Sequence, residues 1–307
     1  MRDIKNVLIC GIGAVGSIYA NQINEYNNNC LKVLVDKNRL ESYTKTPKIF
    51  NGKPLKFNYI LPDNNDYKAD LIIIATKFDA LSDVIKNIKN FVKEDTIIMS
   101  LLNGVTSEEI IAQEYGWQHT LLSYFIGHSA MRSGNNITYD GIGKIVFGIK
   151  ENAGTNTEDL QTVKNFFDKA GIVYEIPQDM HRALWLKYML NVSSNQPSAI
   201  LKMTFGQMQS NTKFLEFLKK IMKEVQNIAK AEGVNNTDTM IDEALTSFHK
   251  MIPNGKTSML QDIEAGRKTE VEMFAGTMIK LGEKYNIPTP YNQVLKDLVD
   301  IIEEEQT

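Results

Sequence analysis

The sequence predicts an α/β protein with an N-terminal, doubly wound parallel sheet and an all-helical C-terminal domain. A glycine-rich turn joins the first apolar strand to the first helix. Strands then alternate with helices up to about residue 174, which is typical of a parallel sheet covered by helices on both faces. Beyond residue 178 almost every segment has helical periodicity instead. We therefore expect one domain at residues 1–177 and a second at residues 178–307.

The glycine-rich turn follows directly after the apolar strand 7–10 and opens the helix 14–25. Gly11 permits a tight turn, Gly13 lets a pyrophosphate approach the backbone, and Gly16 lets the helix pack closely on the strand. Asp36 ends a second apolar strand about 20 positions after Gly16, the spacing at which an acid meets ribose hydroxyls. The sequence therefore predicts a Rossmann dinucleotide site with these residues: Gly11, Ile12, Gly13, Ala14, Val15, Gly16 and Asp36.

The rest of the first domain continues the alternation of strands and helices. The Asn-Gly pair at 51–52 predicts a hairpin between segments 48–50 and 55–60. Thr106 and Glu109 have the spacing of a capping box at a helix start. The other expected elements are strand 31–35, helix 39–44, strand 70–76, helix 78–92, strand 96–102, helix 107–114, strand 121–125, a strand pair formed by 137–139 and 144–149, and helix 158–170.

The second domain shows helical periodicity between glycine and proline breaks. The expected helices are 184–192, 213–231, 237–251, 258–282 and 293–305. The apolar residues of segment 214–222 fit either a core or a subunit interface, so a homodimer stays open.

Composition and charge exclude several classes of protein. Lys and Arg number 34 against 37 Asp and Glu, which leaves no broad basic face for nucleic acid. The apolar runs are too short to span a membrane, and the N-terminus opens into a strand rather than a secretory signal. Cys10 and Cys30 fall at opposite ends of neighbouring strands, so we expect no disulfide and a cytoplasmic location. No spacing of cysteines and histidines indicates a metal.

Two polar residues follow buried strands of the first domain. Lys77 comes after strand 70–76, and Asn103 comes after strand 96–102. Parallel sheets bind ligands beyond the carboxyl ends of their strands, so both residues are candidates for a site. From position alone, Lys77 equally fits a surface lysine, and Asn103-Gly104 fits a simple turn.

The helical half carries two polar stripes. Lys187, Asn191 and Asn195 are four residues apart, which places them on one face of a helix amid apolar residues. Ser258 and Asp262 are also four residues apart, and we expect Glu270 further along the same helix. Solvent-exposed stripes are the alternative interpretation of both patterns.

In this order, the glycine turn, Lys77, Asn103-Gly104, the Lys187 helix and the segment from Ser258 to Glu270 resemble the ketopantoate reductase (2-dehydropantoate 2-reductase) family. The resemblance covers nearly the whole chain. It implies an oxidoreductase that reduces 2-dehydropantoate to pantoate with NADPH or NADH, a step toward pantothenate and coenzyme A, in a cleft between the two domains. It implies Lys187 as general acid, Lys77 and Asn103 near the cofactor, and these substrate-binding residues: Asn103, Asn191, Asn195, Ser258 and Glu270.

The chemistry of these residue types agrees with that role. Hydride addition to a ketone leaves negative charge on oxygen, which a nearby ammonium stabilises and then protonates. Amides and a hydroxyl bind a carboxylate without taking part in proton transfer. A carboxylate such as Glu270 accepts a hydrogen bond from a substrate hydroxyl and disfavours substrates that lack it.

Two features depart from the family pattern. The family's Asn-Pro pair is here Asn195-Gln196-Pro197, which puts the direction of Asn195 in doubt. Many members have a basic residue where this chain has Asp36, and an acid there favours NADH over NADPH. Lys37 and Arg39 follow closely and are positioned to accommodate NADPH.

Two other functions are compatible with the sequence. One is a related reductase or dehydrogenase of another small 2-keto or 3-hydroxy acid. The other is a dinucleotide-binding sensor without catalysis.

Overall fold

The chain forms two compact units, residues 1–181 and residues 182–307. The computed structural model describes residues 2–127, 131–141, 143–150 and 157–306. Within these ranges no helix is both long enough and apolar enough to cross a membrane.

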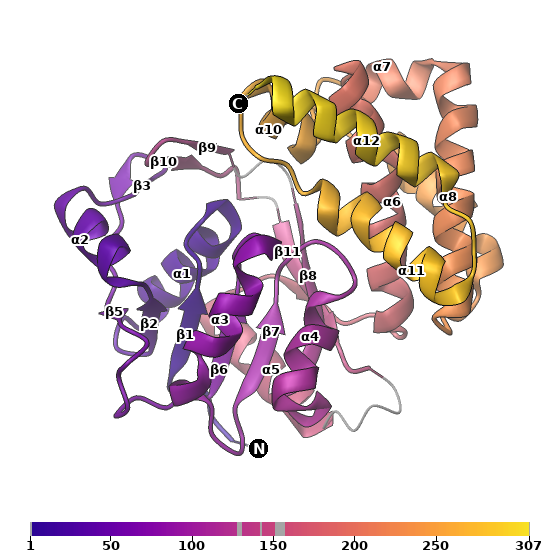
Figure 1. Ribbon diagram of the computed structural model, residues 1–307. Coiled ribbons are helices and arrows are strands. Elements are labelled where there is room, and N and C mark those ends of the chain that lie inside the picture. The colour runs from indigo at the N-terminus through magenta and orange to yellow at the C-terminus, as the bar shows by residue number, and fades with distance from the viewer. Residues whose placement is uncertain (1, 128–130, 142, 151–156, 307) are drawn as a thin grey trace. The chain divides into compact units, whose positions relative to one another are not determined.

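The first unit is built on a twisted sheet whose central strands are parallel (Figure 1). In the described part of the chain its strand order is β12-β11-β8-β7-β6-β1-β2-β5. β11 and β12 are the exceptions in direction, since β11 pairs antiparallel with β8 and β12 pairs parallel with β11. The strands are β1 (Val7–Cys10), β2 (Leu31–Leu34), β5 (Tyr59–Ile60), β6 (Leu71–Ile74), β7 (Ile97–Ser100), β8 (Thr120–Gly127), β11 (Gly143–Gly148) and β12 (Tyr174–Glu175).

Helices cover both faces of this sheet, and each central strand is therefore buried on both sides. One face packs against α1 and α5, through side chains such as Ile18 and Phe167. The other face packs against α3 and α4, through Leu81 and Ile111. This arrangement confirms the predicted doubly wound fold. The helices of the unit are α1 (Ala14–Tyr26), α2 (Lys37–Lys45), α3 (Leu81–Asn87), α4 (Ser107–Tyr115) and α5 (Thr157–Ala170).

A smaller sheet accounts for two differences from the expected strands. The hairpin at Asn51-Gly52 forms, but its second strand is β4 (Lys53–Pro54) paired with β3 (Ile49–Phe50). Segment 55–60 instead ends in β5, which joins the main sheet beside β2. The predicted pairing of 137–139 with 144–149 is wrong, since β10 (Asn136–Thr138) pairs with β3 and β9 (Met131–Ser133), and β11 pairs with β8.

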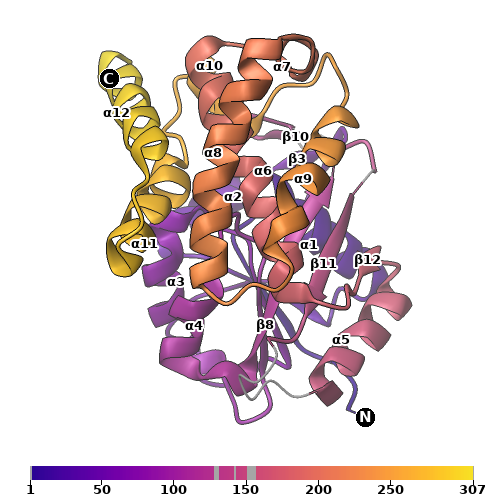
Figure 2. The same ribbon diagram turned by 90° about the vertical axis from the view of Figure 1, so that its right-hand side faces the viewer.

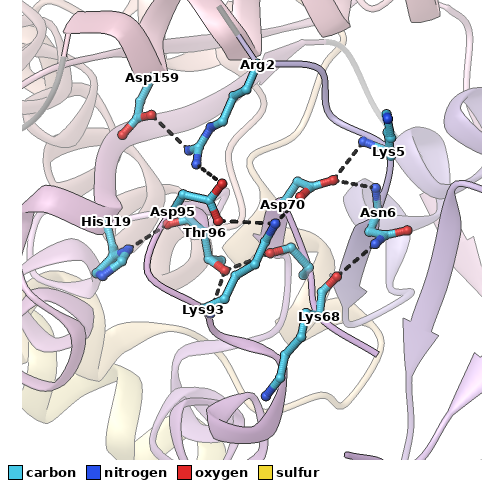
Figure 3. A network of polar contacts seen from close by, with 11 residues as sticks. Arg2, Lys5, Asn6, Lys68, Asp70, Lys93, Asp95, Thr96, His119 and Asp159 are labelled. Atoms are coloured by element: carbon cyan, nitrogen blue, oxygen red, sulfur yellow. Dashed lines mark hydrogen bonds and ion pairs between the residues drawn. The ribbon is translucent and has the colours of Figure 1, made fainter. Parts of the chain in front are cut away.

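A network of charged residues ties the N-terminal segment to the amino ends of the strands (Figure 3). The carboxylate of Asp70 accepts hydrogen bonds from the backbone N–H groups of Lys5 and Asn6 at 2.8 and 2.9 Å, and from the Lys93 ammonium at 2.6 Å. Arg2 bridges Asp95 and Asp159. These charges have a structural explanation, because Asp70 satisfies two backbone donors at the edge opposite the glycine turn and Arg2 pairs with acidic side chains.

The second unit is helical, and its longest helix, α6 (Met180–Leu201), is the one that the others surround. Between residues 188 and 199 every residue of α6 except Asn191 is buried, as expected for a helix contacted on several sides. Figure 2 looks onto these helices, with α8 in front of α6. The other helices are α7 (Phe205–Ser210), α8 (Thr212–Ala231), α9 (Met240–His249), α10 (Ser258–Glu264), α11 (Thr277–Tyr285) and α12 (Pro290–Glu305).

The single helix expected over 258–282 is wrong. α10 ends at Glu264, and Gly266 then adopts a left-handed φ of +60°, which turns the chain. The Arg267 guanidinium pairs with Asp262 at 2.7 Å across this turn. A π-helical segment, Glu272–Gly276, leads into α11. Glu270 therefore does not share a helix face with Ser258 and Asp262.

We predict that Gly16→Ala lowers the free energy of unfolding by about 3 kcal/mol or more. A β-carbon on Gly16 would lie 1.9 Å from the carbonyl oxygen of Gly11, so α1 must move away from β1. Gly13→Ala is the matched control, because its β-carbon meets nothing within 4 Å. Urea unfolding followed by circular dichroism should show this variant within about 1 kcal/mol of the wild type. Equal stability of both variants would contradict the close packing.

Candidate functional site

The turn between β1 and α1 has the features of an anion site. Gly11 has φ +94°, and a β-carbon there would lie 2.7 Å from the carbonyl oxygen of Ala75. Gly13 is the N-cap of α1, and no side chain caps this helix. The first amides of α1 therefore face the open space beside Gly13, where a helix N-terminus favours a phosphate.

The parallel register of β1, β6 and β7 brings the loops that follow these strands to one edge of the sheet. Ile74 of β6 lies between Cys10 of β1 and Ser100 of β7. The Ala75 N–H donates to the Cys10 carbonyl, and the Leu101 N–H donates to the Ile74 carbonyl, both at 2.8 Å. The turn that starts at Gly11 and the loops that carry Lys77 and Asn103 therefore start side by side, as the sequence analysis expected.

The two polar residues of these loops differ in exposure. Lys77 is exposed at the start of a short 3₁₀ turn, Phe78–Ala80. Asn103 is half-buried between the end of β7 and α4. The hydroxyl of Thr76, beside them, is buried and has no hydrogen-bond partner within the described ranges. Sequence reasoning missed Thr76, although a hydroxyl residue directly after a buried strand was a usable signal. A bound dinucleotide fits this edge, since it supplies acceptors to Thr76 and to the amides of α1.

Asp36 has a structural role that the sequence analysis did not foresee. It is the N-cap of α2, and its carboxylate accepts the backbone N–H of Arg39 at 2.7 Å. Its other oxygen lies 3.5 Å from the Arg39 Nε. The side chain of Asp36 is 53% exposed, so the carboxylate keeps lone pairs for a ligand while Arg39 offsets its charge.

The capping box expected at Thr106 is wrong. Thr106 is the N-cap of α4, but its side chain makes no capping hydrogen bond. Ser107 and Glu108 are instead buried and bonded to each other.

The second unit places the polar stripe of α6 as the sequence predicted. Lys187 and Asn191 are half-buried, and Asn195 is 6% exposed. With a rise of about 1.5 Å per residue, successive members lie about 6 Å apart along the helix. The Asn195 amide donates to the Asn191 carbonyl at 3.2 Å, which is a contact between adjacent members of the stripe.

Asn195 connects α6 to α10. Its amide oxygen accepts from the Ser258 hydroxyl at 3.1 Å and from the backbone N–H of Met259 at 3.4 Å. The shifted proline therefore leaves Asn195 directed at Ser258. Pro197 lies inside α6 without ending it, and the Gln196 side chain donates to the Val192 carbonyl nearby.

The segment that follows Glu270 is held by a residue that the sequence analysis did not single out. Tyr188 is buried, and its hydroxyl donates to the carbonyls of Met273 and Phe274, at 3.2 and 2.8 Å. The wider turn of a π-helix displaces carbonyls from the regular ladder, so they accept from a side chain. Glu270 is half-buried at the start of this segment, and its carbonyl accepts from the N–H groups of Met273 and Phe274. Tyr188 thus links α6, next to Lys187, to the backbone that follows Glu270.

The described residues hold no group of three or more His, Cys, Asp or Glu side chains suited to a metal ion. Cys10 and Cys30 are both free and buried.

Family models match most of the chain. The model described as ketopantoate reductase PanE/ApbA matches residues 7–152, and its C-terminal counterpart matches residues 179–303. A 2-dehydropantoate 2-reductase of Streptococcus pyogenes is 24% identical over 95% of this chain and 96% of its own.

Solved structures share the fold over both units. A ternary structure of D-mandelate dehydrogenase with NADH and anilino(oxo)acetate has a TM-score of 0.85 at 22% identity, over 98% of this chain and 99% of its own. A dimeric ketopantoate reductase from Staphylococcus aureus has a TM-score of 0.76 at 20% identity, over 98% of this chain and 100% of its own. The two family matches, one in each half, show that this chain belongs to the ketopantoate reductase family of NAD(P)-dependent oxidoreductases.

Proposed function

We propose that this protein reduces 2-dehydropantoate to pantoate with a reduced nicotinamide cofactor. The observation that carries the proposal is the contact with Ser258 of Asn195, which lies in the same stripe of α6 as Lys187. The second unit therefore holds a cation, amides and a hydroxyl, while the first unit has a glycine turn that leads into a helix without a side-chain cap. A 2-keto acid needs those groups for its carbonyl and its carboxylate.

The first unit holds the cofactor in this proposal. The amides of α1 bind the pyrophosphate beside Gly13, and Asp36 accepts hydrogen bonds from ribose hydroxyls. Thr76, Lys77 and Asn103, at the same sheet edge, would hold the nicotinamide half. When bound, the cofactor supplies the hydride.

Lys187 is the general acid. As the ketone becomes an alkoxide, the ammonium stabilises the negative charge and then donates a proton to the oxygen. Its rotatable donors on a flexible stem suit a transfer whose geometry changes during the reaction.

The other polar residues of the second unit bind and orient the substrate. Asn191 and Asn195 offer N–H donors to the substrate carboxylate. The Ser258 hydroxyl, which otherwise donates to the Asn195 amide oxygen, turns to the carboxylate when substrate binds, and no proton needs to leave these groups. Glu270 accepts a hydrogen bond from the terminal hydroxyl of 2-dehydropantoate. This last contact selects for a substrate with a hydroxyl, because the carboxylate otherwise loses a partner.

A second candidate function is the reduction of another 2-keto acid. The D-mandelate dehydrogenase structure, which holds anilino(oxo)acetate, favours this alternative because it has the same fold over both units. Glu270 separates the two functions, since an aromatic or branched 2-keto acid has no terminal hydroxyl for it. We also propose a homodimer, in keeping with the dimeric relative from Staphylococcus aureus.

The direct test is an assay of the purified protein with 2-dehydropantoate and NADH or NADPH, followed by the loss of nicotinamide absorbance. Turnover supports the proposal. Turnover with other 2-keto acids but not with 2-dehydropantoate supports the second candidate. Cofactor binding without turnover of any 2-keto acid would indicate a sensor instead.

We predict that Lys187→Ala folds normally but lowers kcat by a factor of about 100 or more, because the alkoxide loses its proton donor. Lys219→Ala, on the exposed side of α8, is the control and should keep wild-type kinetics. Steady-state assays with both variants measure this. Wild-type kcat in Lys187→Ala would remove Lys187 from the mechanism.

We predict that Glu270→Gln lowers kcat/KM for 2-dehydropantoate about tenfold, because a neutral acceptor replaces a charged one. The rate with a branched 2-keto acid that lacks the hydroxyl should change little. Glu283→Gln on α11 is the control, since Glu283 is exposed. If Glu270→Gln affects both substrates equally, the proposed hydroxyl contact is wrong.

We propose that NADH is preferred over NADPH, because the Asp36 carboxylate repels a 2′-phosphate. Asp36→Ala removes that charge and releases Arg39 to meet the phosphate. The ratio of kcat/KM for NADH to that for NADPH should therefore fall about tenfold. Glu41→Ala, elsewhere on α2, serves as the control for a change of charge. A strong NADPH preference in the wild type, unchanged in Asp36→Ala, would contradict this assignment.

A further inference from the structure

A buried carboxyl group lies beneath the loop that carries Asn103. Glu108 is in the first turn of α4 and is 1% exposed. Three serines around it are equally buried: Ser100, Ser107 and Ser123. A carboxyl group is rarely buried this completely unless it has partners, so the contacts of Glu108 call for an explanation.

A chain of hydrogen bonds connects Glu108 to the end of β7. The Ser107 hydroxyl donates to one oxygen of Glu108 at 2.7 Å, and the Ser100 hydroxyl donates to Ser107 at 2.9 Å. The backbone N–H of Leu102 lies 3.4 Å from the Ser100 hydroxyl and donates to it. Leu102 directly precedes Asn103, so this series of hydrogen bonds ends at the loop that would hold the cofactor in the proposed function.

The other carboxylate oxygen of Glu108 binds the backbone of the neighbouring strand, β8. It accepts the backbone N–H of Ser123 on β8 at 3.1 Å, and the Ser123 hydroxyl donates to the Ser100 carbonyl at 2.7 Å. Ser100 is thus held from both its side chain and its backbone. Loss of Glu108 would leave buried donors without an acceptor at this strand end.

We propose that Glu108 is a positioning residue, which sets the conformation of loop 101–104 through Ser107 and Ser100 and so determines how Asn103 meets the nicotinamide cofactor. This inference rests on the proposed function, because it concerns the same cofactor edge.

The direction in which the Ser107 and Ser100 hydroxyls donate depends on whether the Glu108 carboxyl group carries a proton. When the carboxyl is ionised, Ser107 donates to it and Ser100 donates to Ser107, as the contacts are arranged here. When it is protonated, its O–H donates to Ser107, and Ser107 then donates to Ser100. In that state the Ser100 hydroxyl accepts from both Ser107 and the Leu102 N–H and no longer donates to Ser107. The bonds then no longer polarise one another in one direction, so the bond from the Leu102 N–H weakens. The ionised form therefore holds the loop more firmly.

Burial raises the pKa of Glu108 to about 7, and the neighbouring Glu109 contributes in the same direction. Glu109 is itself paired with Lys150 at 3.0 Å. Asp83 and Lys86 of α3 are exposed, and Lys144 of β11 is paired with Glu175. β7 carries no charged residue. Because the folded pKa lies above the unfolded value of about 4.3, the free energy of unfolding falls as the pH rises toward 7.

The test measures the dissociation constants of NADH and NADPH between pH 6 and 9, by cofactor fluorescence, without any substrate. The wild type should bind more tightly as the pH rises through about 7. Glu108→Gln, which cannot ionise, should show no such step and should keep the weaker, low-pH affinity. Glu108→Ala should weaken binding about tenfold at every pH, since the loop loses its support.

Glu109→Gln is the matched control, because it changes the adjacent glutamate in a half-buried ion pair and should keep the pH step, moved to a slightly lower pH. A purely structural role for Glu108 predicts altered melting temperatures with unaltered dissociation constants, and that result would overturn the proposal. So would a pH step of wild-type size in Glu108→Gln. If the wild type binds neither cofactor, the proposed function itself fails, which is a distinguishable outcome.

Discussion

The close approach of α1 to the end of β1 is the constraint on which the chemistry of the first unit depends. No side chain fits between Gly16 and the carbonyl of Gly11, so the helix starts directly above the strand. Its first amides, which have no side-chain cap, then lie at the sheet edge. The register of β1, β6 and β7 brings the loops that carry Lys77 and Asn103 to this edge as well. One backbone contact therefore determines where an anion and the groups around it can meet.

The second unit fixes its polar groups by a different principle. Asn195 is almost completely buried, and Ser258 and the Met259 N–H supply donors to its amide oxygen. Tyr188 similarly binds carbonyls that a π-helical segment exposes. Buried polar groups of this kind tolerate little displacement, because each lost hydrogen bond leaves an unsatisfied partner. This rigidity suits groups that must orient a small substrate.

Local patterns in the sequence were sufficient to predict the fold class and to place several candidate residues on their helix or loop. The glycine turn, the strand that precedes it and the stripe of Lys187, Asn191 and Asn195 depend on spacing within one element, and spacing is visible in a sequence. Glu270 was placed on a long helix because the periodicity continues through Gly266. That glycine ends α10 through its backbone conformation, which periodicity does not reveal.

Local patterns do not predict contacts between elements that are distant in the sequence. No local pattern distinguishes Glu108 from its neighbours in the helix, yet it is almost completely buried and bonded to β8. Asp36 differs from Glu108, because the sequence analysis interprets it as a cofactor ligand and the structure adds a second role as the N-cap of α2. A capping carboxylate is held in place before any ligand arrives, so a ribose would meet an acceptor that is already oriented. The structural and functional interpretations of Asp36 therefore support each other, and the cap is a physical reason for an acid at this position.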